Sequence, residues 1–324
     1  MLNDLIRQSK VQNSIEFIIP AKDPSPNFRS LLHDWLSQNV SEDWAVSYCI
    51  VDDGSSNGCI ERLVEGMDGR YRVLRNKVSL GRSGAVNNGI NSSLADYVII
   101  LDSDCRPESQ STLSYIIESF AAGADLVFGK LTSEGGGFWS RYFEGVAKGR
   151  ERDFLAGNKA AFTTQYCGVK KNIFKTVGLF CERYTHYGFE DRDLILRLHA
   201  VCEKIVFAEN SVVYHDDSPT LEGVCLKMFI AGRYSAPIFK YQHPDAYKGM
   251  LYSYVDYENL NVVGKIVANA LGDRREMLSR LGLYILSSKS PYVLKKMYVK
   301  FISGVYFFAG TRQGVCDRGE VKNP

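Results

Sequence analysis

The chain has 324 residues, 45% of them hydrophobic, which is enough for one large domain or two smaller ones with buried cores. Its formal net charge of +2 excludes the strongly basic character of a general nucleic-acid binder, so we expect no nucleic-acid partner. Eight cysteines occur without a Cys-x-x-Cys pair or a disulfide-framework spacing, which favours reduced thiols in the cytoplasm. The N-terminus has no apolar signal core, so we expect a cytoplasmic protein, free or peripheral at the cytoplasmic face of a membrane.

The first 130 residues alternate short β-branched runs with amphipathic stretches. This alternation predicts βαβ units and an α/β fold, with a mainly parallel sheet flanked by helices. The predicted strands cover residues 15–19, 45–51, 71–74, 96–101 and 125–129. The predicted helices cover residues 28–38, 60–65, 83–93 and 110–121.

Polar residues follow three of these strands, at the ends that share one edge of a parallel sheet, where ligands bind. They are Pro20, Ala21 and Asp23 after the first strand, Asp52 and Asp53 after the second, and Asp102, Ser103 and Asp104 after the fourth. Two carboxylates one residue apart suit a divalent cation shared with a phosphate, Mg²⁺ or Mn²⁺. The alternative is that these acids only open the following turn or cap a helix.

The pattern changes after Lys130. Residues 133–137, which include three glycines, predict a flexible hinge, and the charged segment through Arg152 is compatible with a helix or a lid. A last β-like run at residues 211–214 ends in His215, and the chain then becomes almost wholly helical. We therefore predict a domain boundary near residue 217 and a helical C-terminal region over residues 218–324.

The helix expected over residues 292–308 combines Lys295, Lys296 and Lys300 with a face of tyrosine and phenylalanine. That composition suits an interfacial helix on anionic lipid. Packing of the same apolar stripe against the rest of the protein is the alternative.

Taken in order, the strings at 17–21, 51–55, 81–89, 102–104, 177–180 and 188–194 resemble the inverting family-2 glycosyltransferases. The resemblance covers about residues 14–217 and implies the Rossmann-like GT-A fold of nucleotide-diphospho-sugar transferases. It implies a catalytic domain over 1–217, with a nucleotide-binding half (1–130) and an acceptor-side half (131–217). Region 218–324 would then contact a membrane or a partner.

The resemblance also implies roles for individual residues. The nucleotide sugar, expected to be a UDP-sugar, would contact Pro20, Ala21, Asp23, Asp52, Asp53, Gly81, Arg82, Asn87, Asp102 and Ser103. Mn²⁺ or Mg²⁺ would bind Asp102, Asp104 and His215, although His215 could instead be a structural histidine. The acceptor would contact Gln165, Tyr166, Gly188, Phe189 and Glu190, and the loop over residues 163–168 would line the donor sugar and the acceptor.

An inverting transfer needs a base that takes the proton of the attacking hydroxyl, and Asp191 is the predicted base. With Glu190 it begins a helix predicted over residues 191–199, where the helix dipole favours a carboxylate. Simple N-terminal capping by acids is the alternative. Glu190 is expected to bind acceptor hydroxyls beside this base.

Two strings depart from the family pattern. Where relatives have A-R-N-x-G this chain has Val86 in place of arginine, and Arg82, one turn earlier, either replaces it or is a surface residue. The family's F-D-E becomes Phe180-Cys181-Glu182, which affects the acceptor pocket.

The sequence thus predicts a hexosyl- or N-acetylhexosaminyltransferase that acts on a glycan or lipid-linked glycan, in bacterial-type surface polysaccharide or glycoconjugate synthesis. A sugar-1-phosphate nucleotidyltransferase is an alternative, but Ala21 to Pro26 lacks its glycine-rich, basic signature. A catalytically degenerate nucleotide-sugar-binding subunit is a second alternative. The donor sugar, the acceptor and the linkage stay open.

Overall fold

The computed structural model describes residues 13–67, 69–158, 160–215 and 219–319. Within these residues the chain forms two compact units. The first takes in the residues up to Gly135, those from Phe143 to Phe180, and those from Leu194 to the end of the sheet. The second combines Gly136–Tyr142, Cys181–Asp193 and the helices after residue 218.

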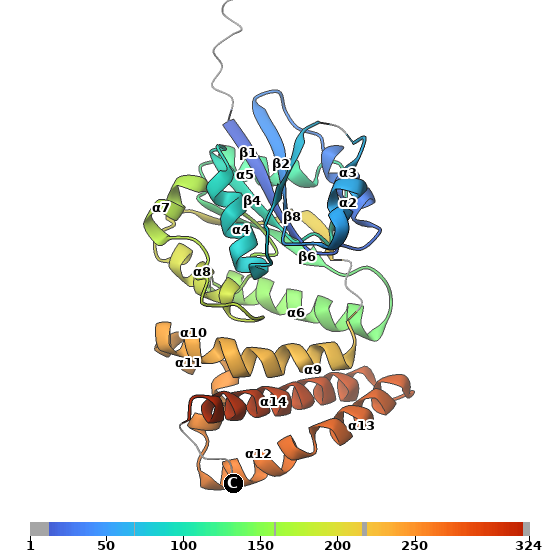
Figure 1. The fold of residues 1–324 in the computed structure, drawn as a ribbon, viewed down its shortest axis with the longest axis vertical. Helices are drawn as coiled ribbons and strands as arrows, with labels where there is room; N and C mark the ends of the chain where they lie inside the picture. The colour runs from blue at the N-terminus through green and yellow to red at the C-terminus, as the bar shows by residue number, and fades with distance from the viewer. Residues whose placement is uncertain (1–12, 68, 159, 216–218, 320–324) are drawn as a thin grey trace, which may run out of the picture. The chain divides into compact units, whose positions relative to one another are not determined.

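The first unit contains a mixed sheet flanked by helices (Figure 1). It has eight strands in the order β3-β2-β1-β4-β7-β6-β8-β5. Its strands are β1 (Asn13–Ala21), β2 (Trp44–Asp52), β3 (Tyr71–Arg75), β4 (Tyr97–Leu101), β5 (Cys105–Pro107), β6 (Leu126–Thr132), β7 (Tyr166–Lys170) and β8 (Ile205–His215). Strand β7 runs antiparallel to β4 and β6, and β5 runs antiparallel to β8, while the other pairs are parallel. The α/β fold and the five strands predicted up to residue 129 are confirmed.

Strand β8 is longer than the predicted run at residues 211–214, because a bulge in the middle of the strand interrupts its sequence pattern. Its register against β6 shifts after the Gly129 and Ala208 pair, so that Lys130 faces Val212. Glu209 and Asn210 are exposed in this irregular stretch and interrupt the apolar pattern that reveals a strand in sequence.

Helices cover both faces of the sheet, and each face has its own hydrophobic core. Along β1, Phe17 and Ile19 belong to one core while Ile18 belongs to the other, as the period of two in a strand requires. The first core includes α2 (Phe28–Leu36), α3 (Cys59–Val64) and α5 (Thr112–Ala121). The second includes α4 (Gly81–Ser92), α7 (Phe174–Val177), the end of α6 (Phe138–Leu155) and the later part of α8 (Glu190–His199). The charged segment after the glycines is therefore a helix.

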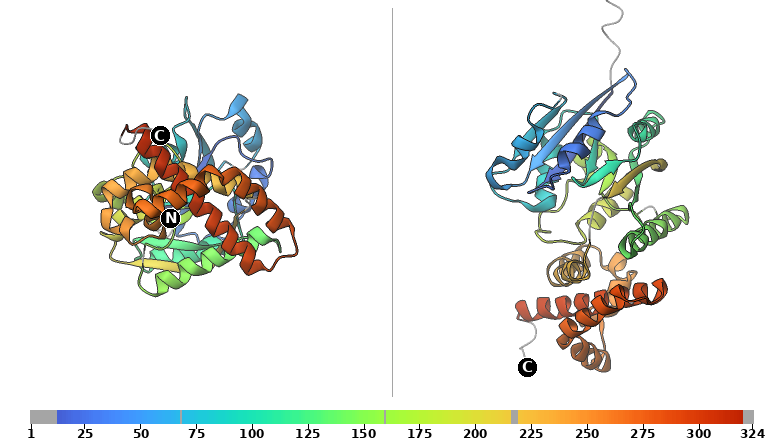
Figure 2. Two further views of the ribbon diagram at one scale, coloured as in Figure 1. Left: turned by 90° about the horizontal axis from the view of Figure 1, so that it is seen from below. Right: turned by 90° about the vertical axis from the view of Figure 1, so that its right-hand side faces the viewer.

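The second unit is helical after residue 218, as predicted. It contains α9 (Leu221–Ile230), a π-helical turn η4 (Ala231–Ser235), α10 (Ala236–Gln242), α11 (Pro244–Lys248), α12 (Val262–Asp273), α13 (Arg275–Ser287) and α14 (Tyr292–Asp317). Short 3-10 turns lie between α11 and α12. Helix α14 lies between α9 and the α12–α13 pair (Figures 1 and 2).

A small-residue contact joins α14 to η4. A Cβ atom on Gly314 would lie 2.7 Å from the carbonyl oxygen of Arg233, so this helix crossing needs glycine. Leu221, Cys225 and Ile302 are buried in the core of the same unit. None of the eight cysteines, which all lie within the described residues, forms a disulfide. No helix among the described residues has both the length and the hydropathy of a bilayer-spanning segment.

Candidate functional site

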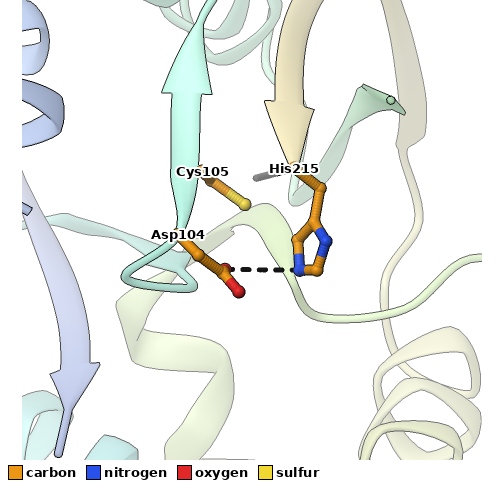
Figure 3. Close-up of side chains that lie close together, drawn as sticks. All are labelled: Asp104, Cys105 and His215. Atoms are coloured by element: carbon orange, nitrogen blue, oxygen red, sulfur yellow. Dashed lines mark ion pairs between the residues drawn. The ribbon is translucent and has the colours of Figure 1, made fainter. Parts of the chain in front are cut away.

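Three side chains meet where β4 and β8 end. Asp104 and Cys105 lie at the turn from β4 into β5, and His215 ends β8 (Figure 3). The antiparallel register of β5 and β8 pairs Cys105 with His215. As a result Oδ1 of Asp104 lies 3.3 Å from Nε2 of His215, and ligand atoms of all three residues lie within 4.8 Å of one another.

The donor atoms of this cluster fit a divalent cation of the Mg²⁺ or Mn²⁺ kind only in part. A carboxylate oxygen and an imidazole nitrogen suit Mn²⁺, whereas a sulfur atom is a soft ligand. Burial raises the pKa of the Cys105 thiol well above its usual value, and the charges of Asp102 and Asp104 add to this effect. Asp104 and His215 are therefore the two side chains of the cluster that fit such an ion.

Asp102 contacts a different residue, Arg82. The Nε and Nη2 atoms of Arg82 lie 2.9 and 2.8 Å from Oδ1 of Asp102. Arg82 also donates to the hydroxyl of Thr164 at 3.1 Å, and its guanidinium lies 5.7 Å from the ring centre of Phe180. Arg82 is thus a fixed cation beside the acidic turn and not a solvated surface residue. Thr164 lies in the loop that the family resemblance assigned to the donor sugar and the acceptor, but its contact with Arg82 was not predicted.

Gln165 also belongs to this edge. Its carbonyl oxygen accepts a hydrogen bond from the backbone N–H of Asp102 at 3.0 Å, and its Nε2 atom lies 3.5 Å from Nε2 of His215. Ser103 lies between the two acids of the same turn. Gln165 is therefore close to the candidate metal ligands, although the sequence interpretation assigned it to the acceptor.

Asp53 organises the loop that leads into α4. Its carboxylate accepts hydrogen bonds from Nδ2 of Asn76, the hydroxyl of Ser79, and the backbone N–H groups of Leu80 and Gly81, at 2.7 to 2.9 Å. The side chain is buried. Both carboxylate oxygens thus hold the loop that immediately precedes Arg82 in α4. Asn76 was not among the predicted site residues. It directly follows β3 at the same sheet edge, and this position could have identified it from the sequence.

The loops after β1 and β2 are joined to each other. Asp23 accepts from the backbone N–H of Ser56 at 2.8 Å, and the hydroxyl of Ser55 accepts from the backbone N–H of Asp23 at 2.9 Å. Asp52 accepts from the backbone N–H of Ser55 at 2.7 Å. Pro20 and Ala21 end β1 beside these loops, and the Ala21 carbonyl accepts from the N–H of Asp53. The predicted donor residues after both strands therefore form one connected set.

Two further predicted site residues are tied into the fold. The side chain of Asn87 bonds both the N–H and the carbonyl of Phe180, each at 2.9 Å. Tyr166 is fully buried in β7, and its hydroxyl lies 2.8 Å from that of Ser211. Burial raises the pKa of Tyr166. The polar atoms of both side chains thus bond to the protein itself.

The predicted acceptor residues Gly188, Phe189 and Glu190 belong to the second unit, where they precede and begin α8. Gly188 and Phe189 both have positive φ, +106° and +69°, and a left-handed conformation is rare for phenylalanine. The Phe189 ring packs against Phe239, Tyr252 and Phe307, with centroid distances of 5.0, 5.7 and 6.4 Å. This packing compensates the backbone strain, which such loops often store at functional sites.

Hydrogen bonds fix the same segment on either side. The hydroxyl of Ser235 in the π-helical turn donates to the carbonyl of Tyr187 at 3.0 Å. Oδ1 of the buried Asp193 lies 2.7 Å from Nε2 of His243. Neither Ser235 nor His243 was a predicted site residue, because only the tertiary fold brings them to α8.

Helix α8 begins at Glu190, one residue earlier than predicted, and carries Glu190, Asp191 and Asp193 in its first turn. The partial positive charge of the helix N-terminus stabilises carboxylates at these positions. Glu190 is buried, whereas Asp191 is only half-buried. Of the two adjacent acids, Asp191 is therefore the more accessible to a substrate.

Comparisons with known proteins agree with this architecture. The family model described as Glycosyl transferase family 2 matches residues 16–178. The chain is similar to a Campylobacter jejuni protein named GalNAc(5)-diNAcBac-PP-undecaprenol beta-1,3-glucosyltransferase, 25% identical over 206 residues (61% of this chain, 65% of the relative). It is also similar to a Bradyrhizobium elkanii N-acetylglucosaminyltransferase, 32% identical over 108 residues (32% and 57%). The matches thus span less than two thirds of either relative.

Two solved structures share the fold at low sequence identity. A mannosyltransferase of Pyrobaculum calidifontis, in complex with GDP-Man and Mn²⁺, has a TM-score of 0.61 at 15% identity over 94% of this chain and 87% of its own. Residues 1–349 of S. aureus TarS, in complex with UDP, have a TM-score of 0.52 at 13% identity over 96% and 93%. These likenesses confirm the GT-A fold implied by the sequence.

Proposed function

This chain belongs to glycosyl transferase family 2, and on that premise we propose that it transfers a sugar from a nucleotide sugar to a hydroxyl of a glycan acceptor. The observation that carries the proposal is the approach of Asp104 and His215 to 3.3 Å at one edge of the sheet. These residues are far apart in the chain, and the pairing of β5 with β8 brings them together.

Asp104 and His215 would hold a divalent cation, Mn²⁺ or Mg²⁺. When bound, such an ion supplies positive charge to the diphosphate as it leaves. Arg82 adds a second positive charge near the same turn, because its guanidinium is held between Asp102 and Thr164. The Asp53 loop positions Arg82, since its carboxylate fixes the backbone of Leu80 and Gly81 immediately before it.

Asp191 would act as the base in an inverting transfer. It would take the proton of the acceptor hydroxyl while the acceptor oxygen attacks the anomeric carbon from the face opposite the departing diphosphate. The half-buried position of Asp191 in the first turn of α8 supports this role, and the burial of Glu190 makes the neighbouring residue a poorer candidate.

A UDP-sugar is the proposed donor, and a glycan, free or lipid-linked, is the proposed acceptor. The donor proposal rests on the family resemblance of the loops after β1 and β2, and TarS provides a related fold in complex with UDP. The acceptor proposal rests on the Campylobacter relative, whose name specifies an undecaprenol-linked substrate. We extend the proposal to bacterial-type surface polysaccharide or glycoconjugate synthesis, at the cytoplasmic side of a membrane.

Calorimetric titration with UDP, with and without Mn²⁺, tests the donor and metal proposals together. We expect Mn²⁺ to strengthen UDP binding in the wild type, and Asp104→Asn or His215→Gln to remove that gain. Asp96→Asn is the matched control, because Asp96 bonds Ser14 near the start of β1 and β4, away from their carboxyl ends. Metal-independent UDP binding in the wild type would contradict the metal site.

A screen for hydrolysis of nucleotide sugars tests the enzyme class. Slow release of UDP and free sugar from one donor supports glycosyl transfer. Release of pyrophosphate from UTP and a sugar 1-phosphate would instead indicate a nucleotidyltransferase. Binding without turnover on any donor, also with glycan acceptors present, would indicate a catalytically inactive binding subunit.

A further inference from the structure

The hairpin of α13 and α14 exposes large apolar side chains that its own core does not use. Met277, Leu281 and Tyr284 on α13, and Leu294, Met297 and Phe301 on α14, are 43% to 72% exposed. Their spacings of three and four residues form one stripe along each helix. We call these six residues the hairpin surface.

Contacts between the two helices place both stripes on the same side of the hairpin. The helices run antiparallel, since the hydroxyl of Tyr298 donates to the carbonyl of Leu278 at 2.7 Å and Lys295 donates to that of Leu286 at 2.7 Å. A Cβ on Gly282 would lie 2.8 Å from the Tyr298 ring. By helical geometry the stripe on α14 lies about a quarter turn from this contact and the stripe on α13 about a third of a turn, both in the same direction.

The segment that carries the hairpin surface has charges of one sign. Residues 277–301 contain no aspartate or glutamate, and they contain Arg280, Lys289, Lys295, Lys296 and Lys300. Arg280, Lys289 and Lys300 are exposed. Helical spacing places Arg280 and Lys300 at the border of the apolar stripes. Such long side chains can keep their charges at a polar boundary while an apolar face beside them is buried.

We propose that the hairpin surface docks on a lipid bilayer whose headgroups are anionic. The apolar stripes would enter the boundary between headgroups and acyl chains, and the basic border would meet the phosphates. A second copy of the chain fits less well, because a symmetric dimer through this surface would bring two basic borders together. The inference rests on the proposed function only in that a lipid-linked acceptor would lie at such a bilayer.

Flotation of the full chain with lipid vesicles tests the proposal without donor or acceptor. We expect binding to phosphatidylcholine vesicles that contain phosphatidylglycerol, weaker binding at high salt, and little binding to phosphatidylcholine alone. The double variant Leu281→Glu with Met297→Glu should lose binding. Arg280→Gln with Lys300→Gln should weaken it by about 30-fold. Leu94→Glu is the matched control, because Leu94 is 98% exposed in the first unit.

Three results would overturn the inference: no flotation of the wild type with anionic vesicles, equal flotation with both vesicle types, or full binding by the two hairpin variants. A dimer in solution that Leu281→Glu with Met297→Glu dissociates, without vesicle binding, would assign the surface to a second copy instead. UDP affinity of each variant should equal that of the wild type. Vesicle binding by a chain that fails to bind UDP would reject the proposed function and leave the lipid surface standing.

Discussion

Replacement of Asp53 by asparagine separates two roles for this residue. By family resemblance its carboxylate would accept the N3–H of a uracil base. In the structure, Oδ1 accepts from Asn76 and the N–H of Leu80, and Oδ2 accepts from Ser79 and the N–H of Gly81. The loop-anchor role therefore predicts a loss of stability, whereas a base contact alone predicts a loss of UDP affinity.

The size of the stability loss follows from the four hydrogen bonds. In Asp53→Asn the remaining oxygen keeps two donors, and the hydroxyl of Ser79 can rotate to accept from the new amide. The N–H of Gly81 has no such freedom and would face an N–H group in place of an oxygen. Loss of one hydrogen bond to a charged, buried acceptor costs about 1.5–3 kcal/mol. We expect the free energy of unfolding to fall by about 2 kcal/mol.

Urea denaturation measures this change, and UDP titration under the same buffer conditions measures the functional effect. The matched control is Asn76→Ala, which removes one donor to the same carboxylate and should cost about 1 kcal/mol. If Asp53→Asn kept wild-type stability but lost UDP binding, the carboxylate would serve the nucleotide and the loop-anchor reasoning would be wrong.

Three further predictions address the base, the pH dependence and the helix crossing. Asp191→Asn should keep UDP affinity and lower transfer by about 10²–10⁴-fold, and near-normal turnover would refute its role as base. Burial raises the pKa of the Cys49 thiol from 9.0 to about 11, so the folded state disfavours the thiolate. The free energy of unfolding should therefore fall as the pH rises from 9 to 11. Urea denaturation of Cys49→Ala over the same pH range should show a smaller fall. Gly314→Ala should lower the free energy of unfolding by about 1–3 kcal/mol, because the new Cβ would collide with the Arg233 carbonyl. Gly249→Ala is the control, since the nearest atom would lie 3.5 Å from its Cβ. In the same urea denaturation experiment it should cost less than about 1 kcal/mol.

Strands with continuous apolar runs were predictable from sequence. β4 consists of Tyr97 to Leu101 and is buried after its first residue, so its periodicity and its acidic end are both visible. β5 has three residues and β7 contains a glycine and a cysteine, and both pair only with partners that are distant in the chain. Propensity over so few residues carries little information, and the antiparallel strands escaped prediction for that reason.

The candidate site shows the same division. The acidic turn and His215 were visible because each follows a strand directly. The pairing of Thr164 with Arg82, and that of His243 with Asp193, were not visible, because each forms across 50 or more residues. The hydrogen bond between Asp102 and Arg82 could not be predicted either. From the sequence alone, Arg82 was equally compatible with a replacement for the family's arginine and with a surface residue.

Residues 188–193 belong to the second unit, and this limits where the chain can be cut or joined to a relative. A chain cut after residue 217 would retain the whole sheet with Asp104 and His215. It would also lack Phe239, Phe307, Ser235 and His243, which hold the strained turn before Asp191. Transplanting the C-terminal helices onto a relative without residues 181–193 would separate the same contacts. Residues 181–193 and the helices after residue 218 therefore form one exchangeable module, interrupted in sequence by the later part of α8 and by β8, which belong to the other unit.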